Sequence, residues 1–122
     1  MEEVGATLRQ QKVSRQLQRD FSEMFQNELR GLAGGALITI SDVWISQDLE
    51  QAKVYISIFP KDHEKEIFEN IQSKNKEIRF QLGKRVRHQL RIVPELLFRL
   101  DHSLDEVEKL EGLLAQIKRS EQ

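Results

Sequence analysis

The sequence contains no cysteine, which excludes disulfides and thiolate metal sites and gives no sign of an oxidising compartment. No apolar run approaches the roughly 20 residues of a membrane helix, and residues 1–11 lack the long apolar core of a signal peptide. We therefore expect a cytoplasmic protein without a membrane partner. A Gly-rich phosphate loop and a cysteine nucleophile are also missing, and His63, His88 and His102 are scattered. These absences predict no metal, no cofactor and no enzymatic activity.

The chain has 122 residues, of which 39% are hydrophobic and 32% charged. This length suits one domain with one core, so we expect a single domain over residues 1–122 with an ordered part at roughly 7–118. The net charge is −1 and the sequence pI about 6.3, whereas a nucleic-acid-binding domain usually has a pI above ~9. The total charge alone therefore does not indicate a nucleic-acid partner.

The distribution of charge is more informative than the total. Residues 74–91 contain seven Lys or Arg against one acid, a net charge of +6. Residues 101–111 contain five acids against one Lys, a net charge of −4. The near-neutral total thus combines a basic segment with an acidic one.

The first half of the chain predicts a helix followed by a β-hairpin. Apolar residues recur every three or four positions over residues 7–30, and the Gly-rich residues 31–35 are expected to end this helix. Residues 37–46 and 52–59 are rich in β-branched residues and predict two antiparallel strands. The first strand changes its alternation midway, which predicts a bulge near residues 41–42.

The second half predicts two successive helices, a third strand and a last helix. Residues 62–90 follow a helical pattern, and polar residues 73–76 interrupt its apolar stripe, so we expect a kink or break there. Pro94 ends helical structure, and residues 95–100 predict a strand. Residues 104–118 predict the last helix.

The most basic stretch is the candidate functional site. Lys84, Arg85, Arg87 and Arg91 lie close together with no acid among them. At about 100° per residue of helix, three of these (84, 87 and 91) fall within a sector of roughly 60° and together can bridge successive phosphates of an RNA strand. The alternative is an ordinary solvated charged face.

Further basic residues extend the candidate RNA-binding set. Lys74 and Lys76 lie at the expected helix break, and Lys12, Arg15 and Arg19 share one face of the first helix. A plain solvent face explains the first-helix cations equally well. Arg79 lies nearer the apolar stripe, which indicates a structural role.

Without its last helix, the predicted order αββααβ is that of a type II KH domain, a single-stranded nucleic-acid-binding fold. We therefore predict an α+β, KH-like domain with a three-stranded sheet, helices on one face and a C-terminal helix. The GXXG loop of KH domains is missing where the two middle helices meet. Fold analogy alone leaves the function open.

Four motifs resemble the bacterial ribosome-binding factor A family over roughly residues 11–118. They are residues 13–17 (VSRQL), 46–55 (SQDLEQAKVY), 78–96 with IR, LGK and LRIVPEL, and 100–104 (LDHSL). At the kink, where the family tends to carry Ala-x-Gly, this chain has Lys74-Asn75-Lys76.

The resemblance implies a non-enzymatic assembly factor that binds the immature small ribosomal subunit and its ribosomal RNA, and we expect the protein to be a monomer. Such a factor aids maturation of ribosomal RNA, most importantly in the cold. A KH-like module for another structured RNA and a protein-binding adaptor are the alternatives.

Overall fold

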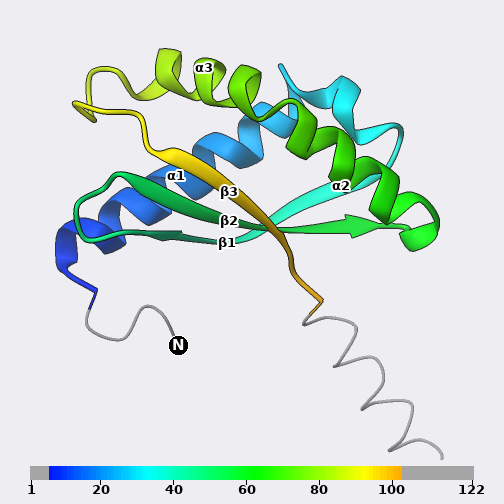
Figure 1. The fold of residues 1–122 in the computed structure, drawn as a ribbon, viewed down its shortest axis with the longest axis horizontal. Coiled ribbons are helices and arrows are strands. Elements are labelled where there is room, and N and C mark those ends of the chain that lie inside the picture. Colours follow the sequence, from blue (N-terminus) through cyan, green and yellow to red (C-terminus); the bar gives the residue numbers. More distant parts are fainter. Residues whose placement is uncertain (1–5, 103–122) are drawn as a thin grey trace, which may run out of the picture.

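The computed structural model describes residues 6–102, and Figure 1 shows how their helices and strands are arranged. The elements are α1 (Leu8–Gln26), the 3₁₀ helix η1 (Arg30–Ala33), β1 (Leu37–Ile45), β2 (Gln51–Phe59), the 3₁₀ helix η2 (Lys61–His63), α2 (Glu64–Ser73), α3 (Asn75–Val86) and β3 (Glu95–Leu100). The order αββααβ confirms the predicted α+β fold class and agrees with a KH-like core. The helix expected at residues 104–118 lies outside the described residues.

The three strands form one mixed sheet in the order β1-β2-β3. β1 pairs with β2 as the predicted antiparallel hairpin, and β3 runs parallel to β2. The register shifts between Ile40 and Asp42, which confirms the predicted bulge. This extra residue brings both Ile40 and Val43 to the buried face.

The helices lie on one side of the sheet, and the core fills the space between these two layers (Figure 1). The rings of Phe21 in α1 and Phe98 in β3 meet edge to face, with centroids 6.3 Å apart. α3 contributes Ile78, Leu82 and Val86, all fully buried. Burial of each such side chain stabilises the fold by about 1.5–3 kcal/mol. This stripe also fixes which face of α3 meets solvent.

α1 begins with a capping box and is tied to the sheet by its first turn. The Thr7 hydroxyl accepts a hydrogen bond from the Gln10 backbone N–H at 3.1 Å, and the Gln10 side chain accepts one from the Thr7 N–H at 2.8 Å. The buried Gln10 amide also donates to the Ile45 carbonyl at 3.1 Å. These bonds hold the start of α1 against the end of β1.

α1 ends at Gln26, earlier than the predicted end at residue 30. Asn27 adopts φ −121° and ψ −92°, which cannot continue the helix, and the Leu29 N–H donates to the Met24 carbonyl at 2.7 Å. This turn places the Leu29 side chain in the core. The glycines that were expected to end α1 end η1 instead, where Gly34 and Gly35 have φ of 57° and 88°.

The predicted break between the two middle helices is a single residue, Lys74. Its backbone, at φ −100° and ψ 16°, lies on the right-handed side of the conformational map, so no glycine is needed. The Asn75 amide donates to the Leu96 carbonyl at 2.9 Å. This hydrogen bond joins the first residue of α3 to β3.

α3 ends at Val86, so the prediction of a helix that continues to residue 90 is wrong. The N–H groups of Gln89 and Leu90 both donate to the Val86 carbonyl, and the chain then turns back toward β3. Leu90 packs on the core from this turn. Because it lies four residues after the buried Val86, the sequence pattern suggested that the helix continues. The parallel pairing of β3 with β2 requires this reversal.

No helix within residues 6–102 is long and apolar enough to cross a membrane.

Candidate nucleic-acid interface

The exposed face of α3 carries cations around an aromatic ring. We call Lys76, Phe80, Lys84 and Arg87 the α3 patch. All four are exposed, and with Arg79, Gly83 and Val93 they line a shallow depression. Arg87 caps the end of α3 and still has helical backbone angles (φ −56°, ψ −25°), so at about 100° per residue the four fall within a sector of about 80°, opposite the buried stripe of the helix. Among the described residues that line this depression there is no carboxylate.

Arg79 lies beside the α3 patch and lines the same depression. Its guanidinium donates to the Val93 carbonyl at 2.7 Å and to the Pro94 carbonyl at 3.1 Å. Gly83 allows Val93 to approach, because a Cβ at residue 83 would lie 3.3 Å from the Val93 side chain. These contacts confirm the structural role expected for Arg79 and hold the returning chain against α3.

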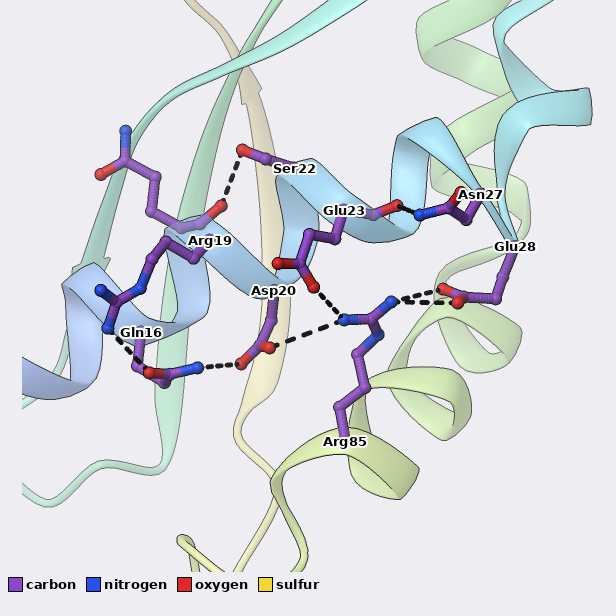
Figure 2. A network of polar contacts seen from close by, with 9 residues as sticks. Gln16, Arg19, Asp20, Ser22, Glu23, Asn27, Glu28 and Arg85 are labelled. Atoms are coloured by element: carbon purple, nitrogen blue, oxygen red, sulfur yellow. Dashed lines mark hydrogen bonds and ion pairs between the residues drawn. The ribbon is translucent and has the colours of Figure 1, made fainter.

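Arg85 belongs to a different environment, shown in Figure 2. Its guanidinium lies 2.7 Å from Glu23, 3.0 Å from Glu28 and 3.8 Å from the buried carboxylate of Asp20. Hydrogen bonds to Glu23 and then Glu28 raise the pKa of Arg85 above its ordinary value. No acid lies among residues 84–91 in the sequence, but the fold brings three carboxylates to Arg85, so this predicted RNA-binding cation is neutralised within the protein.

The acids around Arg85 come from α1 and the turn after it, some 57–65 positions earlier in the chain. The sequence of residues 84–91 alone gives no indication of these acids. Gln16 extends the network, because its amide donates to Asp20 at 3.2 Å and its oxygen accepts from Arg19 at 2.8 Å (Figure 2). Arg85 thus joins α3 to α1 and holds the α3 patch in place.

A second basic surface lies along α1. Lys12, Arg15 and Arg19 are exposed and line a hollow together with Gln89 and Leu90, which follow α3. The structure therefore brings these three predicted residues together and places them beside the turn that ends α3. We call the three cations the α1 patch.

Arg91 does not share a helical face with Lys84 and Arg87, because α3 ends before it. It lines a separate hollow with Arg9 and the turn between β1 and β2, including Asp48. Lys74 is exposed at the break between α2 and α3 and is not among the residues that line the α3 depression. The prediction that 84, 87 and 91 form one sector is wrong for Arg91.

Phe80 is the residue of this site that the sequence reasoning missed. Its side chain is 63% exposed, and the Lys84 ammonium lies 4.8 Å from the ring centroid. The helical periodicity of the sequence could have predicted this exposure, because position 80 lies opposite the apolar stripe that contains Ile78 and Leu82.

Among residues 6–102 no group of three or more His, Asp or Glu has the arrangement of a metal site. His63 lies 3.7 Å from Glu66, and His102 lies 3.1 Å from Glu64. The described part of the site therefore offers charge and an aromatic surface.

Comparison with known proteins identifies the family. The sequence profile of the family described as ribosome-binding factor A matches residues 9–114. A ribosome-binding factor A from Flavobacterium johnsoniae is 42% identical over 110 residues, which cover 89% of this chain and 85% of that protein. Its counterpart from Christiangramia forsetii is 40% identical over 106 residues, which cover 86% of this chain and 81% of that protein.

Solved structures show the same fold. The crystal structure of ribosome-binding factor A from Thermus thermophilus superposes with a TM-score of 0.61 at 22% identity, over 75% of this chain and 94% of that one. The solution structure of a putative ribosome binding factor A from Thermotoga maritima gives a TM-score of 0.53 at 25% identity, over 70% and 84%. Together with the matching profile and the close relatives, the motifs first noted in the sequence place this chain in the ribosome-binding factor A family.

Proposed function

We propose that this protein binds the immature small ribosomal subunit through its ribosomal RNA and assists maturation of that RNA by stoichiometric binding. Membership of the ribosome-binding factor A family supports the ribosomal target. The α3 patch is the observation that carries the RNA contact, because it gathers exposed cations on one face without a lining carboxylate among the described residues. The protein acts as a single RNA-binding domain and a monomer, without a cofactor.

In the proposed complex, Lys76, Lys84 and Arg87 neutralise RNA phosphates. Arg87 supplies the planar, bidentate geometry of a guanidinium, while the two lysines act as mobile point charges. The α1 patch, Lys74 and Arg91 extend the contact to neighbouring phosphates. Arg85 holds α3 against α1, so we leave it out of the phosphate-binding set.

The rigid placement of the patch matters for the mechanism. α3 is fixed to the core by its buried stripe, to α1 by Arg85 and to β3 by Asn75. A preorganised surface loses little conformational entropy on binding and favours one RNA geometry over others. The protein holds this RNA geometry until maturation proceeds, and the need for it is expected to be greatest in the cold.

Sedimentation of cell extract tests this function. The protein is expected to travel with free small subunits and to be missing from translating ribosomes. Nuclease treatment of the extract should release it, because RNA supplies the binding surface. Partners retained after RNA removal would instead identify a protein-binding adaptor, and association with other RNAs alone would identify a different RNA target.

A further inference from the structure

Phe80 is an exposed aromatic ring in the middle of a helix whose other large apolar residues are buried. Its side chain is 63% exposed, whereas Ile78 and Leu82 on either side are fully buried. The ring therefore gains little from the core. Its flat surface is available to a molecule outside the protein.

The surroundings of Phe80 indicate the chemistry of that molecule. Lys76 and Lys84 lie one turn before and one turn after it, about 6 Å along the helix axis on each side. Arg87 completes the depression on the C-terminal side. The acid of α3, Glu77, lies in the first turn and is not among the residues that line the depression. A polyanion with flat apolar groups matches this arrangement in both charge and shape.

Proteins that bind single-stranded nucleic acid combine cations that follow the backbone with aromatic rings on which bases stack. We infer that Phe80 stacks on an unpaired base of the bound RNA, while Lys76, Lys84 and Arg87 hold the phosphates of the same strand. This inference rests on the proposed function and names the form of RNA that the site takes. A paired helix does not fit, because its bases are stacked on each other and their faces are covered.

The contact between Lys84 and Phe80 is compatible with such a role. The ammonium lies 4.8 Å from the ring centroid and so covers one part of the ring in the free protein. Cation–π contacts at exposed sites are weak, and a phosphate attracts the same ammonium more strongly. An arriving strand therefore draws Lys84 to its backbone and exposes the ring to the base.

Binding of three probes to the full-length protein separates base stacking from charge. The probes are single-stranded oligoadenylate, an abasic ribose-phosphate strand of equal length, and double-stranded RNA, each measured by fluorescence anisotropy. Phe80→Ala should weaken oligoadenylate binding roughly 5- to 150-fold. It should leave the abasic and double-stranded probes unchanged. Lys84→Ala should weaken binding of all three.

Two further substitutions at the same position serve as controls. Phe80→Trp keeps an aromatic face and should retain the affinity for oligoadenylate, whereas Phe80→Leu keeps an apolar side chain and should lose most of it. Because residue 80 is exposed, every variant should unfold at the wild-type denaturant midpoint. Equal binding by Phe80→Ala and wild type, full retention by Phe80→Leu, or no binding of oligoadenylate by wild type would each overturn the inference.

The outcome also distinguishes this inference from the proposed function. If Phe80→Ala still binds immature small subunits normally but Lys84→Ala/Arg87→Ala does not, the stacking role fails and the proposed function stands. If Phe80-dependent binding of oligoadenylate is found but immature subunits are not bound, the stacking role stands and the ribosomal target fails.

Discussion

At Arg85 one guanidinium joins α3 to the acids of α1 and the turn that follows it (Figure 2). We expect Arg85→Ala to lower the free energy of unfolding by about 1–3 kcal/mol, because it leaves the buried Asp20 carboxylate without its cation. Urea unfolding monitored by circular dichroism measures this change. Arg87→Ala is the matched control and should change stability by less than about 0.5 kcal/mol. Equal stability of the two variants would show that the network does not join the helices.

The turn between β1 and β2 gives a prediction about pH. The Ser46 hydroxyl donates to the Asp48 carboxylate at 2.6 Å and the Glu50 N–H donates to it at 3.0 Å, which lowers the pKa of Asp48 below its ordinary value of 3.8. Because the pKa of Asp48 is lowered in the folded protein, its ionised carboxylate stabilises the fold above about pH 4. That contribution is lost as the pH falls through the folded-state pKa.

An NMR titration of the Asp48 carboxyl carbon checks this prediction. Its midpoint should lie below 3.8 in the wild type and rise toward that value in Ser46→Ala, which removes the main hydrogen bond. Ser73→Ala, on α2, should leave the midpoint unchanged because it does not touch the turn. A midpoint at or above 3.8 in the wild type would contradict the role of Ser46.

Among the secondary-structure elements, the break before α3 depends on a contact with β3. We expect Asn75→Ala to destabilise the protein by about 1 kcal/mol, because it removes the hydrogen bond to the Leu96 carbonyl. Lys74→Ala, one residue away and exposed, should have a much smaller effect in the same urea titration. A comparable loss in both variants would show that the local backbone, and not the contact with β3, sets the break.

The elements also show where local sequence patterns suffice. Alternation of apolar residues located the hairpin and its bulge, because one face of each strand packs on the core. The end of α1 was missed because the apolar spacing continues to Leu29, which reaches the core from the turn after Asn27. The end of α3 was missed because it depends on distant contacts. α3 stops where the chain returns past Gly83 and Arg79 to pair with β2, and Leu90 continues the apolar spacing although it is no longer helical.

In the candidate site too, local sequence patterns predicted some features, whereas features that depend on distant contacts were missed. Lys84 and Arg87 could be chosen from the sequence because acids are sparse around them. The sequence could not show that Arg85 and Arg91 lie apart from this pair. The position of Arg85 depends on acids of α1, and that of Arg91 depends on where α3 ends. Phe80 was visible in the helical pattern once the buried stripe is known.

For the whole molecule, the net charge of −1 conceals a local basic surface, so binding should depend strongly on salt. If Lys76, Lys84 and Arg87 each neutralise one phosphate, these three cations should contribute about −2 to −3 to the slope with which the logarithm of the binding constant falls against the logarithm of salt concentration, and contacts of the α1 patch, Lys74 and Arg91 should make the slope steeper. Titrations at several salt concentrations measure this slope. Binding that is independent of salt would rule out the phosphate contacts.

The affinity of purified immature small subunits for two charge-matched variants tests the central claim most directly. Lys84→Ala/Arg87→Ala removes two cations of the α3 patch, and Arg30→Ala/Lys65→Ala removes two exposed cations elsewhere. We predict that the first variant binds roughly tenfold or more weakly, with a shallower salt slope, and that the second binds like the wild type. Equal affinity of both variants and the wild type would contradict the assignment of the α3 patch as the RNA-binding surface.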